Sequence, residues 1–382
     1  MSEPATEAEK ETITTHELLE RSARAALELQ REDGSFPPGR NGVYDEPETP
    51  VRTTSHWLTT LSKVYEITGD EVFAEAANDA ADYLLSDEAR PYGYTFHSRN
   101  AEGKDKCDGL IGQAAPMRGL AWAGPTLERP ELLEEAMSVF SAHPFDDQIG
   151  LWERVEIDGT LLSFDRTLNH QITFASASAN LTEEYQGAET RIRQFLNRLA
   201  TNIRTHSDGL IKHYARPAPL ETFVTVLQTP RHWRLFLNEL VVHYYSMSEA
   251  RRKKETGYHP INIYGLAKLK HSFPDHPVWD HQFVDRMINF VDSKEYREVI
   301  NSIDVQCGSM APGIQTAYAL LTFDNRKSSI IADWISQDIE TRFDSDRDLF
   351  IMNALDCNFQ AASVYHAVNL PNIKVDFIHN RP

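Results

Sequence analysis

A single carboxylate stands at the start of a stretch made mostly of small apolar residues. Residues 106–113 place Asp108 beside Gly109, and residues 114–123 are largely alanine, glycine and other apolar types. Burying an ionised carboxylate is costly unless the group is paired or titrates during a reaction. Asp108 is therefore a candidate proton donor or acceptor. The alternative is that it only caps the backbone N–H groups of the helix that follows.

Similar polar segments precede other stretches of small residues, and we call each such segment a mouth. The mouths supply three more candidates for acid–base chemistry: His56, His170 and Asp356. Histidine suits proton transfer because its pKa lies near neutral pH. Amide, acidic and aromatic side chains also collect in the mouths. Such a mixture is typical of a carbohydrate site, where polar groups bond hydroxyls and rings cover the apolar faces of sugars.

The candidate ligands for a sugar are polar or aromatic residues of the mouths. Arg52 is the first choice for a substrate carboxylate, because a guanidinium offers paired donors. The other candidates are Trp57, Gln113, Trp152, Asn169, Gln171, His213, His259, Asn262, Gln315, Asn358 and Gln360. The alternative for many of them is that they cap helices and satisfy the backbone of the loops.

The composition excludes several classes of protein. The chain has 382 residues and a formal charge of −19, which argues against nucleic acid or an anionic membrane surface as the main partner. Only 12 of its 38 basic residues are lysines, and such an acidic, lysine-poor chain is either halophilic or an ordinary acidic protein. It contains no apolar run of about 18 residues and no signal-like N-terminus, so we expect a cytoplasmic protein that does not span a membrane.

Amphipathic stretches alternate with nearly uncharged ones, at an irregular repeat of roughly 45 to 60 residues. The six expected helix pairs are 14–30 with 53–68, 70–85 with 107–123, 130–140 with 172–181, 188–203 with a helix from about 259, 278–291 with 314–323, and 329–343 with 361–368. The fourth pair contains a long insertion at about 209–258. A β-hairpin is expected around Asp158 and Gly159, and the acidic leader, residues 1–13, is expected to be disordered.

Six such pairs predict an all-α fold, an (α/α)6 barrel forming one domain over residues 14–382. A helix with one polar face belongs to an outer ring, whereas an uncharged helix is covered on all sides and belongs inside. The loops that lead into the inner helices then gather at one end and bring the mouths together in a funnel. The N-termini of the inner helices point partial positive charge at this funnel, which suits an anionic ligand.

The helix pairs resemble the six-hairpin glycosidase superfamily, which includes unsaturated glucuronyl hydrolases and related uronate-processing enzymes. Residues 108–117 are similar to the place where those hydrolases keep an acid that protonates the substrate, and residues 208–213 are similar to another recurring loop. The resemblance implies the barrel fold and an acid role for Asp108. His56 occupies a mouth where the hydrolases often carry aspartate. The histidine-rich mouths favour isomerisation, because the related N-acylglucosamine epimerases use histidines for proton transfer.

Over nearly its whole length the chain also resembles a family encoded in haloarchaeal gene clusters for N-glycosylation of surface-layer glycoproteins. The segments that carry this resemblance are residues 33–36, 49–57, 107–113 and 169–171. It implies a sugar-processing enzyme that acts on a glycan or precursor containing uronic acid, as a hydrolase or as an isomerase or epimerase. The carbohydrate substrate is free, nucleotide-linked or lipid-linked.

Two other functions stay open. Cys107, Cys307 and Cys357 each lie in a mouth, and the lanthionine cyclase toroids bind zinc through cysteine and histidine. Because no Cys-x-x-Cys spacing supports such a site, we expect no metal and no cofactor, with the cysteines acting as small hydrophobic residues. The second alternative is a protein without catalytic activity that binds a glycan or a lipid-linked glycan.

Overall fold

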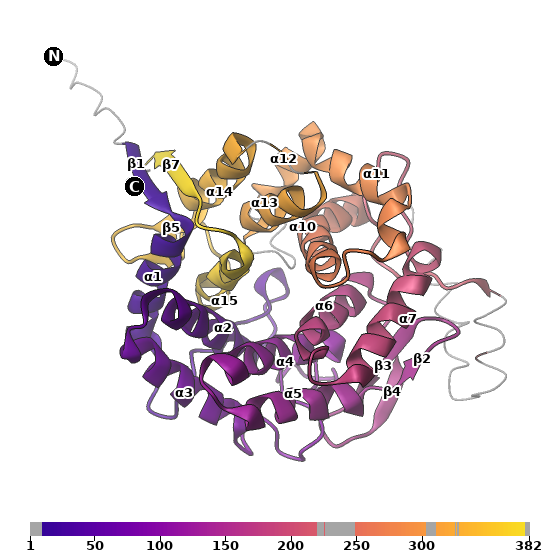
Figure 1. Ribbon diagram of the computed structural model, residues 1–382, viewed down its shortest axis with the longest axis horizontal. Coiled ribbons are helices and arrows are strands. Elements are labelled where there is room, and N and C mark those ends of the chain that lie inside the picture. The colour runs from indigo at the N-terminus through magenta and orange to yellow at the C-terminus, as the bar shows by residue number, and fades with distance from the viewer. Residues whose placement is uncertain are drawn as a thin grey trace.

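The helices form two concentric rings, the arrangement of an (α/α)6 barrel (Figure 1). The computed structural model describes residues 10–219, 225, 249–302, 311–324, 326 and 328–378. The inner ring consists of α2 (Val51–Thr68), α4 (Gly109–Thr126), α6 (Leu168–Ser178), α10 (Glu249–Ser272), α13 (Pro312–Phe323) and α15 (Cys357–Ala362), which the 3-10 helix η8 (Ser363–Asn369) continues. Neighbouring inner helices contact one another in chain order, and η8 contacts α2 to close the ring.

The outer ring consists of helices with one buried and one exposed face. They are α1 (Thr15–Ala26), α3 (Glu71–Leu85), α5 (Pro130–Ala142), α7 (Gln186–Asn202), α11 (Phe283–Asn289), α12 (Lys294–Ile300) and α14 (Ser328–Arg342). The expected single helix over 278–291 is instead followed by a second short helix, α12. Ser293 starts that helix because its side chain accepts a hydrogen bond from the Tyr296 amide.

Small residues let the inner helices approach one another closely. A Cβ atom at Gly119 of α4 would lie 2.8 Å from the Ser55 carbonyl oxygen of α2, and one at Gly265 of α10 would lie 2.6 Å from Ile172 Cγ2 of α6. Since real Cβ atoms do not come so close to other atoms, a larger residue at either position would push two inner helices apart. The glycines therefore set the width of the ring.

Short strands join distant parts of the chain and shape the loops. Strand β1 (Lys10–Thr14) pairs in antiparallel fashion with β7 (Lys374–Ile378), so the first and last described segments meet at the rim of the barrel. Residues 10–13 are thus ordered, and the expectation of a disordered leader is wrong for them; residues 1–9 lie outside the described residues. The other strands are β2 (Phe145–Asp146), β3 (Leu151–Val155), β4 (Leu161–Phe164), β5 (Phe343–Asp344) and β6 (Leu349–Phe350).

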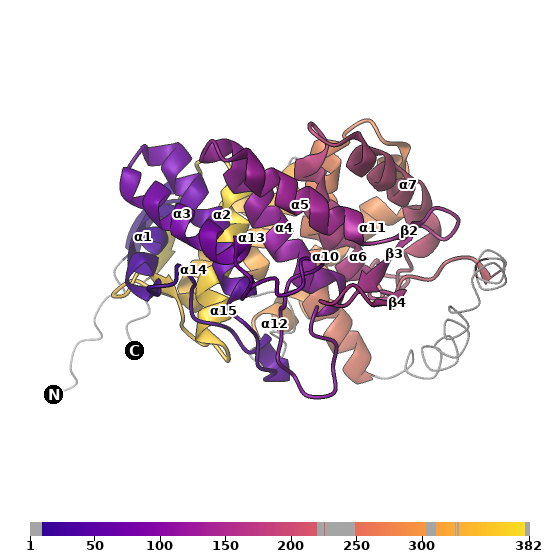
Figure 2. The ribbon, with the colours of Figure 1, turned by 90° about the horizontal axis from the view of Figure 1, so that it is seen from below.

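The loops that enter the inner helices lie along one end of the ring, the lower side of Figure 2. The predicted hairpin around Asp158 and Gly159 is confirmed by the pairing of β3 with β4. The long insertion is shorter than expected at its end, because α10 already begins at Glu249. Most of its middle, residues 220–224 and 226–248, lies outside the described residues.

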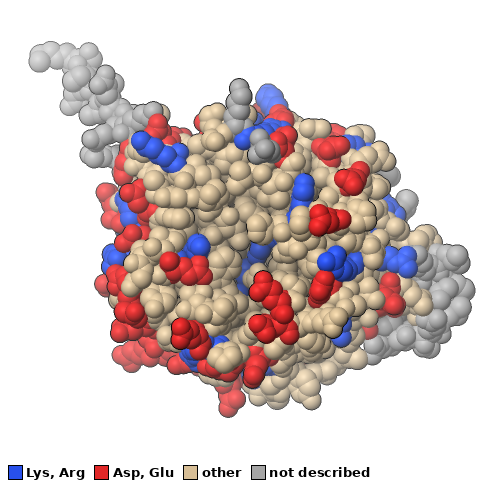
Figure 3. Space-filling model, in the orientation of Figure 1, with Lys and Arg blue, Asp and Glu red and all other residues tan. Residues whose placement is uncertain are grey.

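The surface carries the excess of acidic charge that the sequence predicts. On the face shown in Figure 3, acidic side chains crowd the left and lower rim, over α1 and α3, whereas the area above the centre is mostly uncharged. Across the described part of the chain, no helix combines the length and the apolar character needed to cross a bilayer.

Candidate functional site

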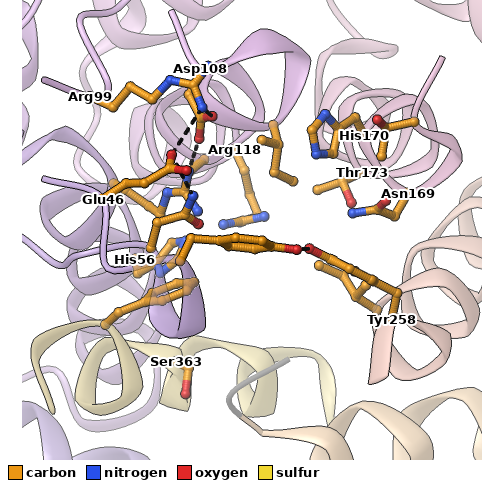
Figure 4. A pocket seen from close by; sticks show the side chains of 18 of the residues that line it. Glu46, His56, Arg99, Asp108, Arg118, Asn169, His170, Thr173, Tyr258 and Ser363 are labelled. Atoms are coloured by element: carbon orange, nitrogen blue, oxygen red, sulfur yellow. Dashed lines mark hydrogen bonds and ion pairs between the residues drawn. The ribbon is translucent and has the colours of Figure 1, made fainter. Parts of the chain in front are cut away.

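A pocket opens at the end of the ring where the loops enter the inner helices (Figure 4). Its empty volume is about 1100 Å³, including space open to solvent. Positions three or four residues apart bring side chains of one helix face into it. The lining residues are Asn41, Tyr44, Glu46, Arg52, His56, Arg99, Lys104, Asp108, Ile111, Ala115, Arg118, Thr167, Asn169, His170, Thr173, His213, Lys254, Tyr258, Ile261, Phe359, Ser363, Tyr365 and His366.

Asp108 is held by two arginines and does not cap its helix. The residue adopts a left-handed backbone conformation, with φ of +53°, and its side chain accepts no hydrogen bond from the first turn of α4. Two other aspartates accept the amide groups there. One oxygen of Asp108 lies 2.8 Å from Arg99 Nη1, and the other pairs with Arg52. The capping alternative is therefore wrong, and two guanidinium groups compensate the buried carboxylate.

Acidic and basic side chains alternate along the mouth side of the pocket. Arg99 also contacts Glu46, with 3.4 Å between Nη1 and Oε2, and Glu46 in turn pairs with Lys104. At the other end, Arg52 Nε lies 3.1 Å from Oε1 of Glu48. We call this set the ion-pair chain; its members in order are Glu48, Arg52, Asp108, Arg99, Glu46 and Lys104. The ion-pair chain connects the start of α2, the start of α4 and the loops that precede these two helices.

Glu48 lies behind the pocket wall and is buried more deeply than the other acids of the ion-pair chain. Its side chain is 1% exposed. Burial raises its pKa to about 7, against the attraction of Arg52, and the nearby carboxylates of Asp108 and Asp356 raise it further. Glu48 is therefore the acid of this region whose charge responds to pH near neutrality.

His170 and Asp165 form a hydrogen-bonded pair at the pocket. His170 Nδ1 lies 2.9 Å from Oδ2 of Asp165, which is 5% exposed, whereas the His170 side chain is 24% exposed. The hydrogen bond and charge of His170, with help from Arg154, hold the pKa of Asp165 well below its usual range despite burial. When His170 is neutral, the Asp165 carboxylate can accept a hydrogen bond from Nδ1–H, and this tautomer leaves a lone pair on Nε2 that can act as a base.

Three other histidines line the pocket and are neutral at physiological pH. Burial lowers the pKa of His213 to about 3, aided by Lys254. Burial together with Arg118 lowers the pKa of both His56 and His366 well below the ordinary value. The His56 ring lies against Tyr365, with 4.2 Å between centroids. These neutral imidazoles can donate hydrogen bonds to hydroxyl groups and accept hydrogen bonds from them.

Arg118 has no carboxylate partner among the described residues. Its side chain is buried, with the guanidinium carbon 4.1 Å from the centroid of the Tyr365 ring, and Nε and Nη2 make no hydrogen bond. Lys268 is also buried near it, and burial together with Arg118 lowers its pKa to about 7. Among the described residues that line the pocket, none brings a carboxylate to Arg118 at this deep end.

Six predicted site residues line the pocket together: Arg52, His56, Asp108, Asn169, His170 and His213. The Arg52 guanidinium already pairs with Glu48 and Asp108. Asn169 is 3% exposed, and its side-chain oxygen has no hydrogen-bond partner. This oxygen can accept a hydrogen bond from a substrate hydroxyl.

The remaining predicted residues do not line the pocket, and most hold loops in place. Gln113 bonds the backbone of Phe96 and Cys107, as Gln171 does for Trp152 and Asp165. Asp356 caps α15 and accepts a hydrogen bond from the Gly42 amide, His259 bonds the backbone of Met287, and Gln315 bonds His366. Asn262, Asn358 and Gln360 each donate a hydrogen bond to a backbone carbonyl. Trp57 and Trp152 lie in the core.

Sequence reasoning missed several residues that line or support the pocket. Arg118 left a signal, because it is the one charged residue in α4. Asp165 and Glu48 left none, since each acts from a loop whose path depends on the tertiary structure. The same holds for Glu46, Arg99 and Lys104.

Cys107 and Cys357, the two cysteines that the structure describes, do not form a recognisable metal site. Cys107 is buried, its thiol donates to Asp105, and burial raises its pKa well above the usual range. Cys357 is exposed, and Cys307 lies outside the described residues. Among the residues that the structure describes, no group of three or more histidine, cysteine or acidic side chains is arranged to hold a metal ion.

Solved structures with the same fold include enzymes that act on sugars. They include cellobiose 2-epimerase from Bacillus thermoamylovorans, with a TM-score of 0.58, 9% identity and coverage of 92% of this chain and 98% of that one. D-mannose isomerase gives 0.58 at 11% identity, over 96% and 99%. The alpha-1,6-mannanase GH76A of Salegentibacter gives 0.53 at 11% identity, over 93% and 98%. At these identities the likeness shows the fold alone.

A much closer relative exists at the level of sequence. No family model matches the chain. It is, however, 38% identical over 364 residues to archaeal glycosylation protein Q of Haloferax volcanii. The matched region covers 94% of this chain and 98% of the relative. With such identity over nearly both full lengths, the chain belongs to the family of archaeal glycosylation protein Q.

Proposed function

We propose that this protein is a sugar-processing enzyme of N-glycan assembly for surface-layer glycoproteins, which isomerises or epimerises a uronic acid-containing glycan or precursor. The observation that carries the proposal is the His170–Asp165 pair facing a polar pocket at the centre of the barrel. The printed name of the relative supports the link to glycosylation, and the epimerase and isomerase among the structural neighbours support the reaction class.

The pair suits removal of a proton from a carbon beside a carbonyl group. Nε2 of His170 would accept that proton, and the electron pair of the C–H bond would pass into an enediolate. For isomerisation, the same imidazole then returns the proton to the neighbouring carbon, while the hydroxyl proton moves from one enediolate oxygen to the other. For epimerisation, an acid on the other face of the sugar must supply the proton to the first carbon. Asp165 stabilises the imidazolium formed in between, because its carboxylate accepts a hydrogen bond from Nδ1–H.

Hydrolysis is less well supported, because it needs a pair of carboxyl groups of which one donates a proton. The two acids that line the pocket, Asp108 and Glu46, each pair with two basic side chains. An ion-paired carboxylate is a weak proton donor. The structure therefore favours Asp108 as the residue that positions Arg52 and Arg99, in place of the expected proton donor.

Arg118 supports a uronate as the sugar. Its guanidinium is buried, lines the pocket and has no carboxylate partner among the described residues. A substrate carboxylate at this point would compensate the charge through two parallel hydrogen bonds. Asn169 and the neutral imidazoles of His56 and His366 surround the same space and offer donors and acceptors for hydroxyl groups.

The test follows the proton. Purified protein is incubated in D2O with the glycan precursors that accumulate in cells lacking this chain, and the products are analysed by mass spectrometry. We expect deuterium on a sugar carbon, and its loss in His170→Asn. His271→Asn, which alters an exposed histidine at the far end of α10, serves as the matched control. Free reducing sugar without carbon-bound deuterium would instead establish hydrolysis, and binding without turnover would establish a glycan-binding protein.

A further inference from the structure

Lys254 is a second cation of the pocket without a carboxylate partner among the described residues. It is half-buried on α10, one turn before Tyr258 and two turns before Ile261, and all three line the pocket. No ion pair or hydrogen bond to a described residue involves its ammonium group. The other two basic residues near the opening, Arg99 and Lys104, both pair with Glu46.

Two tyrosines fix the place of Lys254. The hydroxyl groups of Tyr44 and Tyr258 lie 2.8 Å apart, so the two rings form a bar between the loop before α2 and the first half of α10; Figure 4 labels Tyr258. The ammonium group of Lys254 lies 5.3 Å from the centroid of the Tyr44 ring and 5.7 Å from that of Tyr258. Cation–π attraction therefore holds the charge above the bar without neutralising it.

Lys254 and Arg118 lie at different depths of the same pocket. Tyr44 is 37% exposed, Lys254 is half-buried and Tyr258 is 8% exposed, so the bar runs inward from the opening and Lys254 lies near its outer end. Arg118 is 4% exposed and follows the first residue of α4 by nine positions, or ~13.5 Å along the helix. A carboxylate that makes two hydrogen bonds to Arg118 leaves Lys254 for a different anionic group.

We propose that the opening is a second binding site, which takes an anionic group covalently attached to the sugar held at Arg118. That group is a neighbouring uronate or a phosphate, paired with Lys254, and the ring or chain that carries it lies against Tyr44 and Tyr258. The inference rests on the proposed uronate substrate and deepens it. The substrate is then a linked sugar with at least two negative charges, and a free monosaccharide is a poor ligand.

Calorimetry at one fixed salt concentration tests this. The ligands are glucuronate, a diglucuronate, UDP-glucuronate and a disaccharide of glucuronate with glucose. We expect the diglucuronate or UDP-glucuronate to bind at least about tenfold more tightly than the other two. Tight binding of the diglucuronate alone identifies a neighbouring uronate, and that of UDP-glucuronate alone identifies a phosphate.

Variants separate this inference from the function on which it rests. Lys254→Met should remove the preference for the doubly acidic ligand and leave the affinity for glucuronate unchanged, while Lys253→Met, at the exposed neighbouring lysine, changes neither. Tyr44→Phe provides a second test, because it removes the hydroxyl contact of the bar and should weaken the preference. Equal affinities for all four ligands, or a preference unchanged in Lys254→Met, would overturn the inference. Loss of all binding in Arg118→Met tests the uronate proposal by itself.

Discussion

Charged side chains at the two ends of the pocket differ in whether they have a partner of opposite charge. At the end where the loops before α2 and α4 line the pocket, which we call the mouth end, each acid of the ion-pair chain pairs with an arginine or a lysine of the protein itself. At the deep end, Arg118 stands among neutral histidines with no acid among the residues that line it. Compensated charges hold loops to helices, whereas a buried charge left without its counterion is suited to a ligand. The difference favours a supporting role for the ion-pair chain, and it is consistent with the proposed binding of a substrate carboxylate at Arg118.

Lowering the salt concentration tests whether either end can form, and the largest effect is expected here. The charge of −19 repels itself across the surface, and the Debye length grows from about 3 Å at 1 M salt to about 10 Å at 0.1 M. We expect helical circular dichroism and Tm to fall markedly between 2 M and 0.1 M KCl. Identical curves at both concentrations would show an ordinary acidic protein.

Asp108→Asn removes the carboxylate at the centre of the ion-pair chain. The change leaves Arg52 and Arg99 with reduced compensation in a buried place, so the free energy of unfolding should fall by about 3 to 5 kcal/mol. Urea titration at high salt measures this. Asp105→Asn is a milder control because Asp105 is more exposed, 16% against 7% for the Asp108 side chain. A stable Asp108→Asn protein without activity would restore the proton-transfer role for Asp108.

Arg118→Met removes the buried cation from the deep end of the pocket. In contrast to Asp108→Asn, it should weaken ligand binding and leave the stability of the free protein intact. Charged hydrogen bonds contribute about 1.5 to 3 kcal/mol, so affinity for a uronate should drop by roughly 10- to 100-fold. Stability without ligand should stay the same or rise, because the change removes an uncompensated buried cation. Calorimetry and thermal unfolding report the two quantities. A large fall in Tm for Arg118→Met would mean that this arginine supports the fold as the mouth arginines do.

Glu48→Gln should change how the free energy of unfolding depends on pH, and this is the smallest of the expected effects. The pKa of Glu48 is raised from 4.5 to about 7, so the folded state binds this proton more tightly than the unfolded state. Its contribution to stability is complete below pH 4.5 and is lost as pH rises through about 7. Glutamine should flatten that fall between pH 4.5 and 7, as followed by urea midpoints. An unchanged pH profile would show that Arg52 keeps Glu48 ionised throughout.

Helical spacing made part of the site predictable. His56 lies four residues after Arg52 on α2, and all the predicted residues that line the pocket stand at or near the start of an inner helix, apart from His213. The failures have a shared cause. Amides such as Gln113 and Gln171 are suited both to a sugar and to loop backbone, and only the path of the loop shows which one they bond.

The sequence by itself determined the barrel, because alternating amphipathic and small apolar helices can bury their faces only in two rings. It also determined where the mouths gather, since each loop enters an inner helix from the same end. Only the tertiary structure decided which charges pair. Arg52 and Arg118 are the same residue type on inner helices, yet within the described part of the chain Arg52 pairs with two acids and Arg118 with none. That outcome depends on side chains brought together from distant loops, and local sequence carries no record of such contacts.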